Sequence, residues 1–340
     1  MVSARMWTFT VMRYFCTYFD INYLDRGIIL YRSLEQHVPE FTLFILCMDD
    51  HTHAALSNLD FKNIVLVPLE ELESSDPALL NAKANRSRIE YYFTCSPALP
   101  LYVLQNFLEV DLITYLDADL FFFSTPEPLF EEMGDSSVAI IGHRFAPHLM
   151  DRELYGVYNV GWVSFRRDED ATVCLCWWRE RCLEWCYDRV EVGKFADQKY
   201  LDHWPSLFKG VRVLEHRGAN LAAWNLANYS IKLTNDSIMI DDQNLIFFHF
   251  HGLKRVAPRV YDPFLRHYDL KVNHMPLVKK HIITPYIKAI ETTKRMIGNL
   301  DKCMPTLQHG IRYERKIPTS SASLILALFG QWLRGELVIC

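Results

Sequence analysis

Short apolar runs and helix-like patterns alternate along the first third of the 340-residue chain. Runs rich in β-branched and aromatic residues predict four strands there, at Tyr14–Phe19, Phe41–Cys47, Asn63–Val67 and Leu112–Leu116. Apolar residues also recur at helical spacing from Leu24 to Val38, and again after a Ser96-Pro97 pair that suits a helix start. Alternation of helices with continuously apolar strands is typical of a mostly parallel sheet covered on both faces. We therefore expect an α/β fold.

The remainder of the chain has a more mixed pattern. It predicts further strands at Val138–Gly142, Tyr158–Phe165 and Phe247–Phe250, and a tryptophan-rich helix at Asp170–Tyr187. After about residue 265 the pattern is helical and basic, with Lys279, Lys280, Lys288, Lys294 and Arg295, and it ends in an apolar segment over residues 321–340. We expect one large domain over residues 1–262 and a helical C-terminal extension over residues 263–340.

Composition narrows the class of protein. Apolar residues make up 50% of the chain and aromatic residues 14%, which is enough for a sizeable core. The chain has 41 acidic and 36 basic residues, so it lacks the strongly basic face that a nucleic-acid partner requires. The longest apolar runs, such as Leu324–Phe329, are far shorter than the roughly 20 residues of a spanning helix. Arg13 interrupts the N-terminal apolar stretch, so we expect no signal peptide and a soluble, cytoplasmic protein.

The nine cysteines could in principle form disulfides or a zinc site. Most lie inside apolar stretches, as expected of reduced thiols in a core. Four gather in the predicted tryptophan-rich helix, at Cys174, Cys176, Cys182 and Cys186. Paired CxxC knuckles are absent, and Cys182 and Cys186 share one helical face, where cysteine packs as a small apolar residue. The spacing favours packing over zinc binding.

Two aspartates, Asp117 and Asp119, directly follow the apolar run Leu112–Leu116. Side chains two residues apart on an extended chain point the same way, so both carboxylates can converge on one site. Hard oxygen ligands suit Mg²⁺ or Mn²⁺, and such an ion can neutralise a diphosphate. The alternative is a pair of solvated aspartates at a strand end. Because the flanking residues are strongly apolar and buried carboxylates need a partner, the pattern favours a metal site.

A second polar segment, Phe248 to Lys254, follows another apolar run. Strand alternation places His249 and His251 on the same side of the chain. Together with Gly252, which permits close backbone approach, and the lysine, they could form a corner that binds metal and phosphate. Ordinary core histidines beside a solvated lysine would give the same pattern.

A third polar pair, Asp197 and Gln198, lies within the aromatic segment Lys194–Asp202, which we predict to be helical. These residues could act in a site, or they could simply cap the helix.

Taken together, five segments resemble the metal-dependent glycosyltransferases of the GT-A fold. The resemblance is greatest to glycosyltransferase family 8, which includes glycogenin and the bacterial lipooligosaccharide galactosyltransferases. The five segments span roughly residues 10–255 and are Tyr18-Phe19-Asp20-Ile21-Asn22-Tyr23, Tyr115-Leu116-Asp117-Ala118-Asp119, Tyr158-Asn159-Val160-Gly161, Phe195-Ala196-Asp197-Gln198 and His249-Phe250-His251-Gly252. Two further segments, His143-Arg144-Phe145 and Gly218 to Asn225, resemble those of bacterial surface-polysaccharide transferases. The chain departs from family 8 at Lys254, which comes one residue early, and at Tyr91-Tyr92-Phe93-Thr94, where the family has Tyr-x-Arg.

The resemblance implies a Rossmann-like GT-A domain with flanking helices, divided into a nucleotide-sugar-binding half at about residues 10–120 and an acceptor half at about 121–262. It implies Asp117, Asp119 and His249 as ligands of Mn²⁺ or Mg²⁺, and Asp197 and Gln198 as catalytic residues. The nucleotide contacts that it implies are Tyr18, Asp20, Asn22, Ala118, Gly252 and Lys254. The implied contacts to the donor sugar or the acceptor are Asn159, Gly161, His251 and Asn220.

The activity that the resemblance implies is transfer of a sugar from a nucleotide-diphosphate donor, with a UDP-sugar as the expected donor and retention of anomeric configuration. The expected acceptor is a glycan or lipid-linked saccharide in surface polysaccharide biosynthesis. A sugar-1-phosphate nucleotidyltransferase would need a glycine-rich basic loop where this chain has Thr17-Tyr18-Phe19-Asp20. An aspartate-nucleophile phosphatase would have threonine or valine in place of Phe121. A non-catalytic nucleotide-sugar-binding protein remains an alternative.

The C-terminal region allows two interpretations. The basic segment Lys279–Arg295 and the apolar segment Leu324–Leu333 could contact the inner face of a membrane peripherally, near a lipid-linked acceptor. They could equally form a helical extension that packs on the catalytic domain, since surface helices normally have one apolar face.

Overall fold

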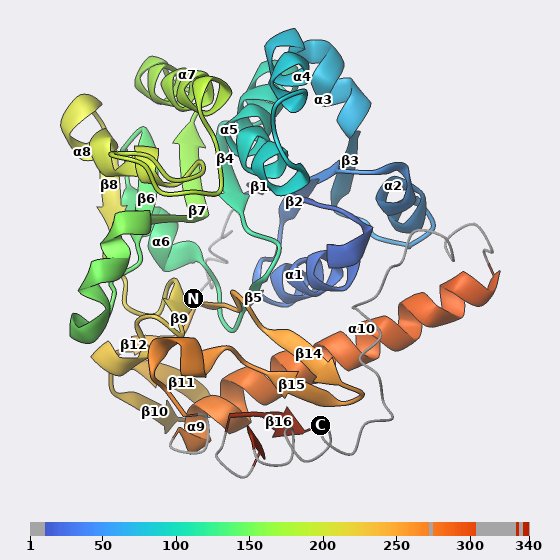
Figure 1. Cartoon of the computed structure of the whole chain (residues 1–340), viewed down its shortest axis with the longest axis vertical. Coiled ribbons are helices and arrows are strands. Elements are labelled where there is room, and N and C mark those ends of the chain that lie inside the picture. The colour runs from blue at the N-terminus through green and yellow to red at the C-terminus, as the bar shows by residue number, and fades with distance from the viewer. Residues whose placement is uncertain (1–10, 272–274, 304–330, 333–335, 340) are drawn as a thin grey trace, which may run out of the picture.

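The computed structural model describes residues 11–271, 275–303, 331–332 and 336–339, and its centre is a seven-stranded sheet (Figure 1). In spatial order the strands are β3 (Ile64–Pro68), β2 (Phe41–Cys47), β1 (Arg13–Phe19), β4 (Leu112–Leu116), β7 (Tyr158–Arg166), β6 (Val138–Gly142) and β8 (Val211–Leu214). Neighbouring strands run parallel, except that β7 lies antiparallel between β4 and β6. The mostly parallel sheet with flanking helices that the sequence predicts is confirmed, and the predicted strand bounds are within about one residue of those observed.

Helices cover both faces of this sheet, because alternate residues of each buried strand point to opposite sides. Phe15 of β1, for example, belongs to the core on one face and Cys16 to the core on the other. The first face is covered by α1 (Leu24–His37), α2 (Asp50–Ser57) and α6 (Glu127–Met133). The second face is covered by α3 (Leu69–Ser75), α4 (Pro77–Lys83), α5 (Arg88–Asn106), α7 (Glu169–Glu184) and α8 (Trp204–Leu207). Figure 1 shows α3, α4, α5 and α7 together on one side of the sheet and α1 on the other.

Three central strands of the sheet have ends that lie at the same edge. β1 and β4 finish at this edge, and the antiparallel β7 begins there, with Leu116 paired to Trp162. A small second sheet continues from this edge and is made of β5 (Leu120–Phe122), β13 (Phe247–His249) and β9 (Leu221–Ala222). Its register sets His249 opposite Leu120. In parallel sheets, ligands bind outside the carboxyl ends of the strands, so this edge is where a site is expected.

The chain after residue 222 forms small sheets and a long helix beneath the central sheet. The sheets are β10 (Ile231–Thr234) with β11 (Ser237–Ile240) and β12 (Gln243–Asn244), and β14 (Lys254–Ala257) with β15 (Val260–Asp262) and β16 (Val338–Ile339). The helices are α9 (Pro276–Val278), a π-helical turn (Lys279–Ile283) and α10 (Thr284–Cys303). Because β16 pairs with β15, the C-terminal region is partly sheet, and the expectation of a purely helical extension over residues 263–340 is too simple.

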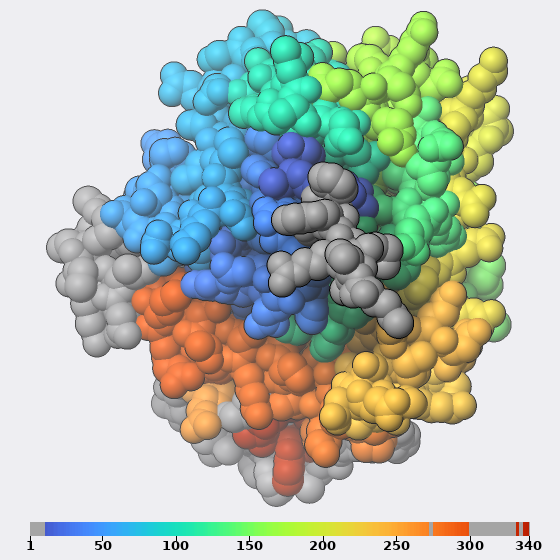
Figure 2. Space-filling view, turned by 180° about the vertical axis from the view of Figure 1, so that it is seen from behind, coloured from blue at the N-terminus to red at the C-terminus, as the bar shows by residue number. Residues whose placement is uncertain are grey.

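The apolar face of α10 is buried rather than free. Tyr286, Ile287 and Ile290 lie in a core with Phe248 of β13, and Ile297 packs in the same core as residues of α1. Seen from behind, the orange surface of α10 lies directly against the blue surface of the N-terminal part (Figure 2). For this helix the packed interpretation therefore holds. Most of the apolar segment Leu324–Leu333 lies outside the described residues, among which no helix is both long and apolar enough to span a membrane.

Two local predictions are wrong. The long helix α5 begins at Arg88 rather than after Ser96, because Ser87 and Glu90 form a reciprocal capping box and the helix then continues through Pro97 and Pro100. The segment around Asp197 is not a regular helix either. It turns through Ala196, which has a left-handed backbone (φ 45°), before a 3₁₀ helix starts at Lys199.

Candidate functional site

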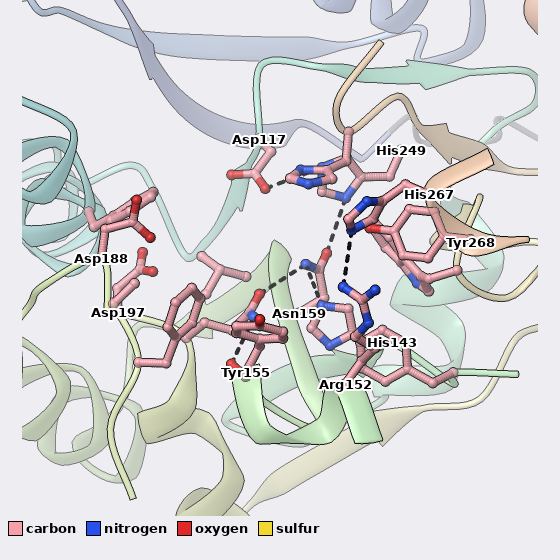
Figure 3. Close-up of a pocket in the computed structure, with 18 of the residues that line it drawn as sticks. Asp117, His143, Arg152, Tyr155, Asn159, Asp188, Asp197, His249, His267 and Tyr268 are labelled. Atoms are coloured by element: carbon pink, nitrogen blue, oxygen red, sulfur yellow. Dashed lines mark hydrogen bonds and ion pairs between the residues drawn. The ribbon is translucent and has the colours of Figure 1, made fainter. Parts of the chain in front are cut away.

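A cavity of about 500 Å³ lies at the edge of the sheet where β4 ends and β7 begins. Residues far apart in the sequence line it and point toward one another (Figure 3). Of the side chains predicted from the sequence, it brings together Tyr18, Asp117, Asn159, Asp197, Gln198, His249 and His251. The cavity thus unites residues from all five motif segments, and Asp119 lies directly behind it.

Asp117, Asp119 and His249 form a carboxylate–histidine cluster. The Nε2 atom of His249 lies 3.0 Å from a carboxylate oxygen of Asp119 and 3.6 Å from one of Asp117. The two aspartates do not converge by strand alternation, as the sequence suggested, because β4 ends at Leu116 and residues 118–119 form a turn. The turn is closed by Leu120 N–H donating to the Asp117 carbonyl, and the β5–β13 pairing then brings His249 to Asp119.

The tautomer of His249 is fixed by Asn159. The backbone N–H of Gly161 donates to Asn159 Oδ1 at 3.1 Å, so this oxygen is an acceptor. His249 Nδ1 lies 3.2 Å from the same oxygen and must therefore donate to it. A neutral His249 then has its free lone pair on Nε2, which faces the two carboxylates. Metal-binding histidines are usually oriented in this way, through a carbonyl that accepts from the other ring nitrogen.

Gly161 provides the room for this arrangement. A Cβ atom at Gly161 would lie 2.6 Å from Asn159 Oδ1 and 3.0 Å from His249 Nδ1. Any other residue would therefore displace the hydrogen-bonded pair. Gly161 itself does not line the cavity. Its role in the structure is to let Asn159 reach His249, rather than to contact a ligand directly.

Burial and the attraction between His249 and the two carboxylates have opposite effects on the pKa values of the cluster. Burial raises the pKa of Asp117 to about 6, against the favourable influence of His249. Burial also opposes ionisation of Asp119, but the adjacent His249 outweighs it and lowers the pKa of that carboxyl to about 2. Burial likewise opposes the charged form of His249, and the two carboxylates still raise the pKa of its imidazole. Such a cluster stabilises a positive charge at its centre, whether a proton or a metal ion.

The donor set fits a divalent metal. Ligand atoms of Asp119, His249 and His251 lie within 4.8 Å of one another, and the Asp117 carboxylate faces the same imidazole. Carboxylate oxygens suit Mg²⁺ and Mn²⁺, and a neutral imidazole is also a common ligand of transition metals. The three residues predicted as metal ligands are thus adjacent, and His251 is near enough to join them.

Asp197 and Gln198 occupy the wall beside Asn159. Asp197 is buried, and that burial raises the pKa of its carboxyl to about 7, with the charge of Asp117 acting in the same direction. Gln198 uses both ends of its amide: its oxygen accepts from Asn159 Nδ2 at 3.1 Å and its nitrogen donates to the Tyr155 carbonyl. A hydrogen-bonded chain therefore runs from Gln198 through Asn159 to His249.

The predicted nucleotide contacts near β1 adjoin the cavity. Tyr18 lines it and shares a hydrogen bond with Ser96 at 3.1 Å. Asp20 caps the short 3₁₀ helix Ile21–Tyr23 and pairs with Arg88 at 2.5 Å, and it also accepts from the Asn22 amide. Asp20 and Asn22 therefore form a structured polar corner beside the cavity rather than part of its lining. Arg88 belongs to this corner, and the sequence analysis missed it.

The remaining predicted residues support the site from behind. Ala118 is buried in the turn between the two aspartates, and Asn220 is fully buried, donating to the Gly142 carbonyl. Gly252 has φ +76°, and a Cβ there would lie 2.4 Å from the Phe264 ring. Lys254 on β14 lies with its ammonium 5.3 Å from the centre of the same ring. None of these four lines the cavity.

Several lining residues were not identified as site residues by sequence reasoning. His143, Phe145 and Trp224 lie in segments that had been noted only for their resemblance to other transferases. Others carried no local signal, because they come from 3₁₀ helices and loops: Arg152, Tyr155, Asp188, His267 and Tyr268.

Burial fits the packing interpretation of the cysteine group. Cys174, Cys182 and Cys186 are free and buried in the core between α7 and the sheet. Burial raises the pKa of the Cys174 thiol and of the Cys182 thiol. Among the residues described, the cluster suited to a metal contains no cysteine.

Comparison with solved structures finds similarity to two glycosyltransferases, among others. The chain is similar to the galactosyltransferase LgtC in complex with donor and acceptor sugar analogs, with 19% identity, coverage of 70% of this chain and 87% of that one, and a TM-score of 0.47. It is also similar to mouse xyloside xylosyltransferase 1, with 14% identity, coverage of 71% and 98%, and a TM-score of 0.46.

Two curated relatives come from Bacillus subtilis (strain 168). The uncharacterized protein YfnF is 38% identical over 251 residues, which are 72% of this chain and 82% of YfnF. The uncharacterized protein YfnD is 30% identical over 308 residues, which are 90% of this chain and 96% of YfnD. No protein-family model matches the chain. At this level of identity and coverage, the chain belongs to the family of the Bacillus subtilis proteins YfnF and YfnD.

Proposed function

We propose that this chain is a metal-dependent glycosyltransferase that takes a sugar from a nucleotide-diphosphate donor. The observation that carries the proposal is the environment of His249. Its Nδ1–H is held by Asn159, so that its Nε2 lone pair faces Asp117 and Asp119 at the border of a 500 Å³ cavity. All five motif segments that resemble glycosyltransferases lie in or beside this cavity, although they are spread over more than 200 residues of sequence.

Asp117, Asp119 and His249 would hold Mn²⁺ or Mg²⁺, with His251 adjacent. When bound, such an ion neutralises the charge that develops on a diphosphate leaving group. The nucleoside, which we expect to be uridine, would lie against Tyr18 and the polar corner of Asp20 and Asn22.

The donor sugar would lie between Asn159 and the pair Asp197–Gln198. Asp197 lines the cavity beside Asn159 and Gln198, where its ionised carboxylate would stabilise positive charge at the reacting carbon. Gln198 and Asn159 are hydrogen-bonded to each other, which fixes both amides. The resemblance of the motif segments to family 8 supports retention of configuration in this reaction. The acceptor that we propose is a glycan or lipid-linked saccharide of a surface polysaccharide.

The proposal is tested by incubating the protein with a panel of UDP-, GDP-, CDP- and dTDP-sugars and Mn²⁺, and measuring release of nucleoside diphosphate. We expect slow release from one donor without any acceptor, and loss of that release in excess chelator. The Asp119→Asn variant should lose the same activity. Arg212→Gln is a suitable control, because Arg212 is exposed on β8, away from the cavity lining. Tight binding without release from any donor would instead indicate a non-catalytic binding protein.

We also keep peripheral membrane association near a lipid-linked acceptor as a proposal. Because the apolar face of α10 is buried, any such contact would have to use basic side chains or residues after 303. Flotation with anionic liposomes at low salt tests it. The full-length chain should float, and a chain truncated at Pro318 should not. Failure of the full-length chain to float would contradict the proposal.

A further inference from the structure

One wall of the cavity is basic. Arg152, from the 3₁₀ helix Pro147–Tyr155, and His267, from the 3₁₀ helix Leu265–Tyr268, both line the cavity, and we call this pair the basic wall. The Arg152 guanidinium lies 3.0 Å from His267 Nε2. Arginine is always a donor, so His267 accepts with its Nε2 lone pair and is neutral in this arrangement. A permanently charged guanidinium and an imidazole that can be protonated are thus in direct contact.

Phe264 positions the basic wall and adds a third cation behind it. The His267 ring stacks on the Phe264 ring, with centres 4.6 Å apart and planes at 14°. Lys254 lies over the same phenylalanine, 5.3 Å from its centre. Burial together with the charges of Arg152 and Lys254 lowers the pKa of His267, and Asp269 only partly compensates. Three basic groups therefore concentrate around one aromatic ring.

Arg152, the permanent charge of the basic wall, has no carboxylate partner among the residues that the structure describes. Within the described ranges of the chain, neither Arg152 nor Lys254 forms an ion pair with a carboxylate. The planar guanidinium is suited to bind a carboxylate or a phosphate through two parallel hydrogen bonds, and here most of its donors are unused. An anionic group placed between Arg152 and His267 would take the place of this neutral contact and supply the counter-charge that Arg152 lacks.

The basic wall lies across the cavity from Asp197. Figure 3 shows Asp188 and Asp197 on one side of the cavity and Arg152, His267 and Tyr268 on the other. Tyr18, which we assign to the nucleoside, lies at the end of β1 and shares a hydrogen bond with Ser96 in the middle of α5. A ligand bound at the basic wall would therefore face Asp197 across the cavity.

Aromatic side chains suited to a sugar lie beside the basic wall. The Tyr155 ring packs against Phe195 at 4.9 Å, and the Trp224 ring packs against Tyr268 at 6.2 Å. All four line the same cavity. Flat aromatic faces next to a basic pair match a ring that carries an acidic substituent.

We propose that the acceptor is an acidic saccharide whose carboxylate or phosphate is bound between Arg152 and His267. The inference rests on the proposed function, because a molecule is an acceptor only if the chain transfers a sugar to it. It makes the basic wall the part of the cavity that selects an acidic sugar over a neutral one. Uronic acids and sugar phosphates share the required chemistry, since both present two or more anionic oxygens to a guanidinium.

The experiment measures binding of three small probes in the presence of saturating UDP and Mn²⁺, and again without nucleotide. The probes are glucuronate, glucose 6-phosphate and the neutral methyl glucoside, and they are titrated into the wild type, Arg152→Gln and Arg212→Gln. We expect at least one acidic sugar to bind about tenfold or more tightly than methyl glucoside, since a charge-assisted contact has roughly that effect. Arg152→Gln should abolish this preference, and the control Arg212→Gln should retain it. The two acidic probes also show whether the preferred group is a carboxylate or a phosphate.

Two outcomes would overturn the proposal. The first is equal binding of all three sugars, or none detectable, in the wild type. The second is an Arg152→Gln variant that loses affinity for UDP with Mn²⁺ as strongly as for the acidic sugar, which would assign the basic wall to the donor diphosphate. Failure of the proposed transferase activity would look different, because no nucleotide sugar would then release its diphosphate, whatever the acidic probes do.

Discussion

The wall of the cavity that carries Asp117, Asp119 and His249 is built from strand ends, whereas the wall that carries Arg152 and His267 is built from 3₁₀ helices. In the first, ladder pairing and a turn fix each backbone, and one amide, Asn159, orients the imidazole. In the second, His267 stacks on Phe264 and accepts one hydrogen bond from Arg152.

This difference indicates a division of labour. The carboxylate–histidine cluster is held by buried hydrogen bonds, as chemistry that depends on sub-ångström geometry requires. The basic wall rests on surface segments, which tolerate change and commonly carry specificity. We therefore expect substitutions in the cluster to affect turnover with any acceptor, and substitutions in the basic wall to affect the choice of acceptor.

The largest effect should follow from Asp119→Asn. The side chain keeps its size but loses the charge that faces His249 at 3.0 Å. Loss of metal-based charge stabilisation of several kcal/mol should reduce turnover at least about 1,000-fold. The melting temperature of the metal-free protein should change by no more than about 5 °C, which corresponds to roughly 2 kcal/mol. Full activity of this variant would place the metal, or the reaction, elsewhere.

Asp197→Asn should reduce kcat by about 100- to 1,000-fold, because a buried charge beside the reacting carbon acts mainly in the transition state. Affinity for UDP and Mn²⁺ should stay within about twofold of the wild type, since Asp197 lies on the sugar side of the proposed donor site. Steady-state kinetics measures kcat, and calorimetric titration measures the affinity for UDP. An equal loss of UDP affinity and turnover would make Asp197 part of the nucleotide site or of the scaffold.

Gly161→Ala should weaken Mn²⁺ binding by about 10- to 100-fold without removing any ligand, which is the usual cost of disturbing a group that orients a metal-binding histidine. Its methyl group would meet Asn159 Oδ1 at 2.6 Å and His249 Nδ1 at 3.0 Å. Gly298→Ala in α10 is the matched control, since a Cβ there meets nothing within 4 Å. Unchanged Mn²⁺ affinity in Gly161→Ala would show that the Asn159–His249 contact does not control the metal.

The smallest effect is expected for His251→Ala. This variant tests whether His251 binds the metal together with the carboxylate–histidine cluster or contacts the donor. Its ring centre lies 6.1 Å from that of His249, and burial with the charge of His249 lowers the pKa of its imidazole. We expect donor affinity to fall about tenfold, as for loss of one hydrogen bond to a charged group. The Mn²⁺ requirement should rise far more in His249→Ala. Metal titrations of both variants, read through activity, test this, and the reverse order would make His251 the third protein ligand.

The sequence predicted the carboxylate–histidine cluster far better than it predicted the basic wall, for a physical reason. Asp117 and Asp119 follow a strand whose apolar pattern is unmistakable, and His249 ends another. The order of such elements along the sheet was enough to expect that they meet. Arg152 and His267 lie in short 3₁₀ helices with no periodic signal, and their proximity depends on how separate loops fold over the sheet.

Other features could be known only from tertiary contacts. Ser96-Pro97 reads locally as a helix start, yet the capping box at Ser87 and packing against the sheet carry α5 through both prolines. Asp197 reads as helical, yet it follows a left-handed Ala196. The role of Gly161 appears only when the side chains of Asn159 and His249 are seen around it.

The central claim is that Asp117, Asp119 and His249 hold a divalent ion in a site that serves a nucleotide-sugar donor. Binding of Mn²⁺ to the wild type and to His249→Gln, with and without UDP, tests it most directly, with free Mn²⁺ followed by electron paramagnetic resonance. The account predicts one ion per wild-type chain, tighter binding when UDP is present, and an affinity at least about tenfold weaker in His249→Gln. Equal Mn²⁺ binding by the two proteins, or binding that UDP does not strengthen, would contradict it.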